Sequence, residues 1–108
     1  MKNLFTTVIL VIVILTSCAD KIPLTAQNKI YAGKWITNDG TWLQVYNNGS
    51  GSFEQSNSSV SGGAVTITDS TIVIGLLGIG STYEINEAPH EENGQWTMTL
   101  DDNVYLKN

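Results

Sequence analysis

From Ile30 onward the chain consists of short runs in which apolar and polar residues alternate. The clearest runs are TWLQVYN at 41–47, AVTITD at 64–69, TYEIN at 82–86 and QWTMTL at 95–100. In the first run, Leu43 and Val45 share one face, and Trp42 and Tyr46 share the other. A period of two with many β-branched and aromatic residues is typical of strands that bury one face.

Residues that form tight turns separate these runs. They are Asn38-Asp39-Gly40, Asn47-Asn48-Gly49, Ser61-Gly62-Gly63, Asn93-Gly94 and Asp101-Asp102-Asn103. Glycine, asparagine and aspartate tolerate the positive φ angles that such turns need. The pattern therefore predicts an all-β domain over residues 30–108. We expect a meander of about eight antiparallel strands that closes into a small barrel or sandwich, because closure removes exposed strand edges.

The first residues follow another pattern. After a start with one lysine, Leu4–Leu15 is an almost wholly apolar run of twelve residues. A helix that spans a bilayer needs about 20 apolar residues, so the run is better explained as the core of a signal peptide over residues 1–17. Residues 18–29 contain Pro23 and no apolar periodicity. They are predicted to form a tether.

Leu15-Thr16-Ser17-Cys18 resembles the bacterial lipobox, in which a leucine and small residues precede an obligatory cysteine. The resemblance implies cleavage before Cys18, lipid transfer to its sulfur and acylation of the new amino terminus. The alternative is an ordinary secretory signal followed by a chance cysteine. We expect a lipid anchor in the cell envelope. Ala19 follows the cysteine, and this favours the outer over the inner membrane, since aspartate at this position favours inner-membrane retention in enterobacteria.

Composition limits the partners of the mature chain. Removing residues 1–17 leaves 108 − 17 = 91 residues with four lysines, no arginine and ten acids, a net charge of 4 − 10 = −6. Nucleic-acid binding is not expected, because phosphate backbones need clustered lysine and arginine. Anionic headgroups would repel this surface, so membrane contact is expected through the acyl anchor.

Gly33-Lys34-Trp35 resembles the GxW signature of the lipocalins, eight-stranded barrels whose tryptophan closes one end. In lipocalins an arginine near the last strand covers this tryptophan, and this chain has no arginine. A broader resemblance, to small Bacteroidota-type lipoproteins described as lipocalin-like, includes IGLLGIGSTYEI at 74–85 and WTMTLDDNVYLK at 96–107. It implies a barrel and an anchor, and no particular activity.

The glycine-rich segment Gly75–Thr82 has the spacing of a phosphate-binding loop, but Ser81 stands where that loop has lysine. We expect an apolar hairpin in which Leu76, Leu77 and Ile79 cap the core. If these side chains are exposed instead, they form a patch suited to a partner or a membrane.

Glu87–Gly94 contains the only histidine, His90, together with Glu87, Glu91 and Glu92. A solvated acidic loop is expected rather than a metal site, because a second histidine is missing. Nucleophilic catalysis needs an activated nucleophile and a base, and this chain has one imidazole and no usable thiol. Neither a cofactor nor an enzymatic activity is expected.

Two functions stay open. The first is a lipid-anchored binding module that holds a small apolar ligand or a lipid, with Trp42, Tyr46, Leu76, Leu77 and Ile79 as candidate contacts. The second is a protein-interaction role in the envelope, as an inhibitor, an immunity protein or an assembly accessory. It would use two predicted loops, Gln55–Gly63 and the acidic loop with Glu87, Glu91 and Glu92.

Overall fold

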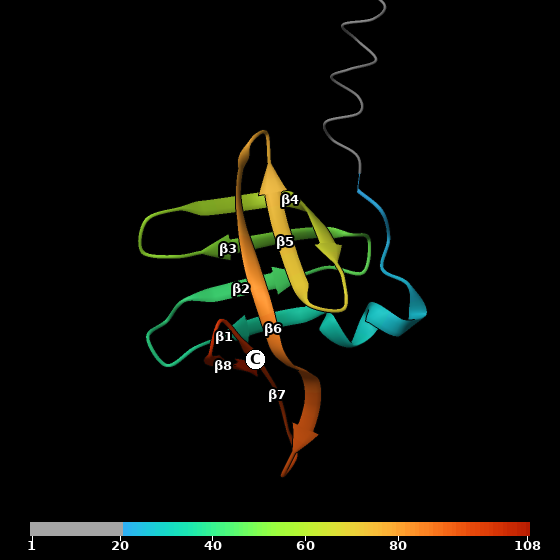
Figure 1. Ribbon diagram of the computed structural model, residues 1–108, viewed down its shortest axis with the longest axis vertical. Helices are drawn as coiled ribbons and strands as arrows, with labels where there is room; N and C mark the ends of the chain where they lie inside the picture. Colours follow the sequence, from blue (N-terminus) through green and yellow to red (C-terminus); the bar gives the residue numbers. More distant parts are fainter. Residues whose placement is uncertain (1–20) are drawn as a thin grey trace, which may run out of the picture.

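The computed structural model describes residues 21–108, so the predicted signal peptide and Cys18 lie outside the described residues. Each strand pairs antiparallel with the next and the last pairs with the first, which closes a barrel (Figure 1). The elements are η1 (Ala26–Tyr31, a 3-10 helix), β1 (Gly33–Ile36), β2 (Trp42–Val45), β3 (Ser50–Glu54), β4 (Ser59–Ile67), β5 (Thr71–Leu76), β6 (Ile79–Glu92), β7 (Gln95–Leu100) and β8 (Asn103–Lys107). The predicted all-β meander is confirmed as a lipocalin-like barrel.

Alternating residues of the strands fill the barrel. In β2, Leu43 and Val45 are buried whereas Trp42 is only half-buried, as the alternation predicts. Phe53 and Tyr83 meet edge to face in the interior, with ring centroids 6.4 Å apart. The buried core is Tyr31, Trp35, Leu43, Val45, Phe53, Val60, Val65, Ile72, Ile74, Tyr83, Met98, Leu100 and Tyr105. Large side chains let a chain this short bury enough apolar surface to fold.

Trp35 lies at the end of the barrel next to η1. It is fully buried, and its indole Nε1 donates a hydrogen bond to the Tyr31 carbonyl at 2.9 Å. Lys107 of β8 is its cross-strand neighbour, with Nζ 5.6 Å from the Trp35 ring and 5.7 Å from the Trp96 ring. A lysine between two aromatic faces thus lies over the tryptophan, where the lipocalin resemblance implies an arginine.

The described part of the predicted tether packs on the barrel. Leu24 packs against the core, and its amide donates to the Asn47 carbonyl at 2.9 Å. The Ile22 backbone passes so close to Gly49 that a Cβ at this glycine would lie 2.0 Å from the Ile22 carbonyl oxygen. η1 begins within residues 18–29, so the folded part starts earlier than residue 30.

The turn predicted at Ser61-Gly62-Gly63 is wrong, since these residues lie inside β4. Gly63 passes close to β5: a Cβ there would lie 2.8 Å from the Gly75 carbonyl oxygen. Glycine is therefore needed for a close strand approach, next to a register shift in the β3–β4 pairing. Only residues 55–58 of the predicted loop link β3 to β4.

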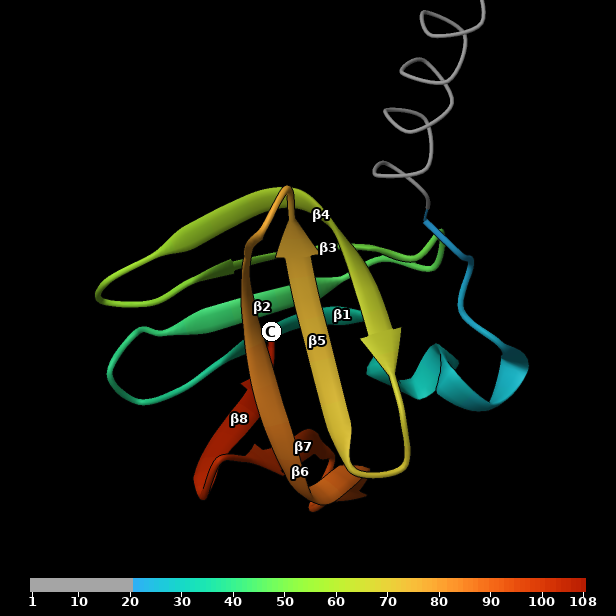
Figure 2. The same cartoon turned by 45° about the horizontal axis from the view of Figure 1, so that its top comes forward.

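The loop predicted at Glu87–Gly94 is also wrong, because β6 continues to Glu92 and only Asn93–Gly94 forms the turn. The β6–β7 register shifts on both sides of Glu87, and Pro89 lies within the second irregular segment. Proline is tolerated there because the irregular ladder does not require its missing N–H. β6 thus runs from the β5–β6 hairpin at one end of the molecule to the β6–β7 hairpin at the other (Figures 1 and 2).

Candidate functional site: the outer face of β6, β7 and β8

Side chains occupy the interior of the barrel, where the first functional hypothesis would place a ligand. Trp35, Leu43, Ile72, Ile74, Met98 and Leu100 have no exposed surface. Near the β3–β4 turn, the Gln55 amide nitrogen donates to Ser81 Oγ at 2.9 Å and to Tyr83 Oη at 3.0 Å. These bonds connect the turn to β6.

The clefts of the molecule lie on its outer surface. Clefts of about 290, 310 and 360 Å³ are lined by turns and by outward-facing residues.

The cleft of about 360 Å³ lies where β8 turns two apolar residues outward. Val104 is 57% exposed and Leu106 is 43% exposed, because Tyr105 between them points into the core. We call this surface the β6–β8 face. It is lined by Glu92, Asn93, Gln95, Thr97, Val104 and Leu106.

An apolar strip extends from this face across the neighbouring strands. Leu106 is the cross-strand neighbour of Ile36 on β1, and Ile36 is the neighbour of Trp42 on β2. Both Ile36 and Trp42 are half-buried. The Lys34 ammonium lies 4.6 Å from the centre of the Trp42 ring. The strip therefore has a cation at the β1–β2 side.

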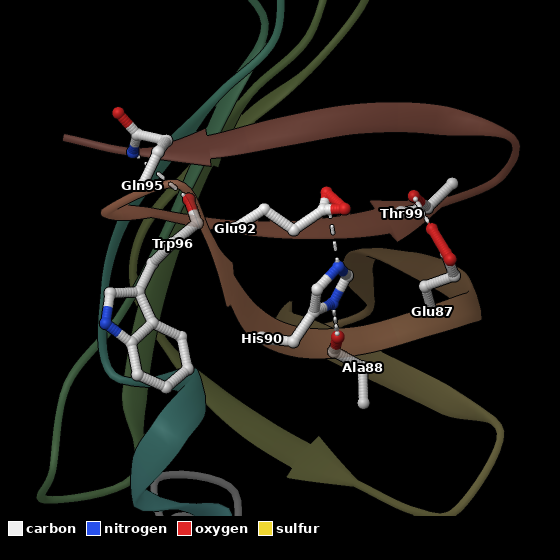
Figure 3. A network of polar contacts seen from close by, with 7 residues as sticks. All are labelled: Glu87, Ala88, His90, Glu92, Gln95, Trp96 and Thr99. Atoms are coloured by element: carbon white, nitrogen blue, oxygen red, sulfur yellow. Dashed lines mark hydrogen bonds and ion pairs between the residues drawn. The ribbon is translucent and has the colours of Figure 1, made fainter.

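Polar side chains border the same face on β6 (Figure 3). His90 Nδ1 lies 2.8 Å from the Ala88 carbonyl oxygen, and its Nε2 lies 3.7 Å from Glu92 Oε2. Thr99 Oγ1 donates to Glu87 Oε1 at 3.1 Å. The Ala88 carbonyl, followed by the two carboxylates, raises the pKa of His90 above its ordinary value. The positive charge of His90 is thus favoured next to the acids.

Negative charge is concentrated in this part of the chain. Six of the ten acidic residues fall between Glu84 and Asp102, a stretch with no lysine or arginine. Glu92 borders the β6–β8 face, whereas Glu91, the preceding residue of the strand, pairs in register with Trp96 and points to the other side. Among residues 21–108, no three histidine, cysteine or carboxylate side chains gather as a metal site.

The candidate ligand contacts fall into two groups on different elements: Leu76, Leu77 and Ile79 share the β5–β6 hairpin, where Leu76 and Ile79 are cross-strand partners, and Trp42 and Tyr46 lie on β2 and just after it. Trp42 faces outward on β2, and Tyr46 is 43% exposed in the β2–β3 turn. Leu76 is half-buried against the core as predicted. The prediction that Leu77 and Ile79 also cap the core is wrong, since they are 75% and 58% exposed. The two-residue turn after Leu76 carries the hairpin tip beyond the core.

Val104 and Leu106 were not predicted as site residues. The sequence feature that could have indicated them is the apolar triplet Val104-Tyr105-Leu106. Because side chains of a strand alternate between its two faces, at least one of three consecutive apolar residues must point outward. Which of them point outward depends on the pairing of β8 with β1.

Comparison of the chain with protein-family models, with curated proteins and with solved structures gives no match. Within residues 21–108, no helix is long and apolar enough to cross a membrane. The eight-stranded barrel is known from the strand pairing alone. The function is inferred below from the surface and the core.

Proposed function

We propose that this protein is a lipid-anchored module of the cell envelope that binds a basic partner protein through the β6–β8 face. The observation that supports this role is an exposed apolar pair, Val104 and Leu106, in a cleft of about 360 Å³ that Glu92 also lines. The second functional hypothesis of the sequence, a protein-interaction role, is thereby preferred to a ligand in the barrel.

The chemistry of the face suits a protein partner. Protein interfaces combine an apolar centre with a polar rim, and charge complementarity sets the rate and the specificity of association. Val104 and Leu106 supply the centre, and Glu87 and Glu92 supply a negative rim. A partner with a basic rim, such as an envelope hydrolase that the module inhibits, would match both features.

A ligand inside the barrel is less favoured, because pockets for small molecules measure about 300–1,000 Å³ and are largely pre-formed. The barrel interior instead contains closely spaced buried side chains, including Trp35, Phe53 and Met98. Such a ligand would have to displace them. Truncating one large aromatic side chain in a protein core costs about 3–5 kcal/mol, and displacing one is expected to cost a similar amount.

The test begins with native mass spectrometry of the lipidated protein, released gently from its own envelope. We expect a stoichiometric second polypeptide. With that partner purified, Leu106→Ser should weaken binding at least 10-fold, and Glu92→Gln should slow association and reduce its salt dependence. Tyr46→Ser is the matched control, because Tyr46 and Leu106 are both 43% exposed.

Two results would contradict the proposal. One is a partner whose affinity is the same for Leu106→Ser, Glu92→Gln and the unchanged protein. The other is a stoichiometric adduct of a few hundred daltons in place of a polypeptide, which would favour the apolar-ligand hypothesis.

A further inference from the structure

We infer that the tip of the β5–β6 hairpin inserts Leu77 and Ile79 into the lipid surface to which Cys18 is predicted to be anchored. This second membrane contact is independent of the partner that the β6–β8 face binds. It rests on the predicted lipidation of Cys18. It adds to the membrane contact that the sequence predicts for the acyl anchor, and it uses the apolar patch that the hairpin forms when its side chains are exposed.

The hairpin is apolar and free of charge. Residues 70–83 contain no acidic or basic side chain, although the chain is acidic overall. Leu77 is 75% exposed and Ile79 is 58% exposed, whereas Leu76 packs against the core. The tip is thus an apolar projection without the acidic residues that anionic headgroups would repel.

Leu77 does not stabilise the turn that it occupies. Its φ is 52°, in the left-handed region that glycine and asparagine tolerate and other residues adopt at a cost. The β6–β7 turn has the same geometry with the usual residue, since Asn93 also has φ 52° and is followed by glycine. Neither the turn nor the core accounts for a leucine here, so an external apolar contact is the remaining role.

The position of the anchor brings the lipid close to the barrel. Cys18 is three residues before Lys21, so their Cα atoms are at most about 11 Å apart. The chain from Ile22 onward is held on the barrel by the bond from Leu24 to Asn47 and by the close passage at Gly49. Only a short link therefore separates the lipid from a segment of fixed position.

The hairpin tip lies at the same end of the molecule as the start of the described chain. Both views place the β5–β6 turn and the start of the blue segment toward one end, and the β6–β7 hairpin toward the other (Figures 1 and 2). Ile22, next to the anchor, is itself 76% exposed. A lipid surface that holds Cys18 can thus meet Ile22 and the hairpin tip together.

The test uses the lipidated chain in vesicles of phosphatidylethanolamine and phosphatidylglycerol. Because acylation occupies Cys18, Leu77→Cys supplies a single reactive thiol for an environment-sensitive fluorophore. Asn93→Cys is the matched control, at the same φ in the opposite hairpin. We expect lipid-borne nitroxide to quench the label at position 77 at least 5-fold more than the label at position 93, and aqueous iodide to show the reverse.

A second measurement needs no label. In vesicles, amide hydrogen exchange at Gly78 and Ile79 should be at least 10-fold faster in Leu77→Asn than in the unchanged protein, because asparagine keeps the turn and removes the apolar contact. Equal exchange rates, or equal quenching at positions 77 and 93, would overturn the inference. The inference would also be overturned if the shielding of position 77 vanished when more lipid dilutes the protein. The hairpin tip would then contact a second copy of the protein and not the lipid. A chain that does not float with the vesicles would overturn the anchor and this inference, whereas binding of a purified partner to the β6–β8 face would still be measurable.

Discussion

At the residue scale, Leu77 combines an exposed apolar side chain with a left-handed backbone. Replacing it with asparagine or glycine should raise the free energy of unfolding by about 1 kcal/mol, because this conformation costs other residues about 1–2 kcal/mol. Urea unfolding of Leu77→Asn measures the change. Asn93→Leu is the reciprocal control and should destabilise the protein, since it places leucine at the same φ in the other turn. A loss of stability in Leu77→Asn would mean that the leucine supports the fold.

The phenol of Tyr105 predicts how stability responds to alkaline pH. Burial raises the pKa of Tyr105 to about 12. Since the folded pKa exceeds the ordinary value of 10.0, the contribution of Tyr105 is complete below pH 10 and is lost as pH rises toward 12. When the pH rises from 9 to 11, the free energy of unfolding should fall in both proteins. The fall should be about 1–1.5 kcal/mol smaller in Tyr105→Phe than in the unchanged protein.

Denaturant unfolding at several pH values measures this difference. Tyr46→Phe, a change at an exposed tyrosine, should leave the alkaline loss in place. Parallel curves for Tyr105→Phe and the unchanged protein would contradict the assignment.

At the scale of the element, the β5–β6 hairpin depends on a close approach of its two strands. Gly75 and Gly80 are cross-strand partners. A Cβ at Gly80 would lie 2.8 Å from the Ile74 carbonyl oxygen, whereas the nearest contact of a Cβ at Gly75 is an ordinary 3.4 Å. Gly80→Ala should therefore cost about 1–3 kcal/mol, the usual range for overpacking. Gly75→Ala should cost less than about 1 kcal/mol. Thermal unfolding of both variants is the measurement, and equal losses would contradict the argument.

The elements also differ in how far the sequence predicts them. β2 and β7 have uninterrupted alternation between turn residues, so local sequence is enough to identify them. β6 does not, because two register shifts and Pro89 interrupt its period. Gly62 and Gly63 have the composition of a turn, but here the glycine at position 63 allows a close approach to β5. That approach is a contact between distant residues, which local composition does not encode.

The candidate site follows the same rule. The acidic character of the β6–β7 hairpin is visible in the sequence, because it depends only on residue type. The exposed position of Val104 and Leu106 depends on the register of β8 with β1 and β7. The exposure of Leu77 depends on how far the hairpin extends beyond the core. The strand register and the length of the hairpin beyond the core are both set by the closed barrel. The apolar part of the site could therefore not be predicted from the sequence alone.

At the scale of the whole molecule, the apolar tip of the β5–β6 hairpin and the acidic β6–β7 hairpin lie at opposite ends. β6 connects them: it begins at the hairpin tip with Ile79 and ends at Glu92 beside the β6–β8 face (Figure 1). If the tip contacts lipid, the acids are held away from anionic headgroups. The partner face would then be presented outward from the membrane. Membrane contact and partner binding are thus compatible in one orientation.

That orientation requires the segment after the predicted anchor to stay on the barrel, and Gly49 permits the contact. Its φ is 88°, and a Cβ would lie 2.0 Å from the Ile22 carbonyl oxygen. Gly49→Ala should release this segment, so that the Leu24 amide loses its bond to Asn47 and exchanges at least 10-fold faster. Gly40→Ala is the control, because Gly40 has φ 89° and no atom within 4 Å of its Cβ position.

The two variants carry the same backbone strain, so a difference between them isolates the contact with Ile22. Both should retain the protected core amides of β2 and β7, which report an intact barrel. In vesicles, Gly49→Ala should also reduce the nitroxide quenching of a label at position 77, because the barrel can then turn on a longer flexible link. If the Leu24 amide exchanges at the same rate in both variants, the close passage at Gly49 does not hold the segment, and the hairpin would reach the lipid without a fixed orientation.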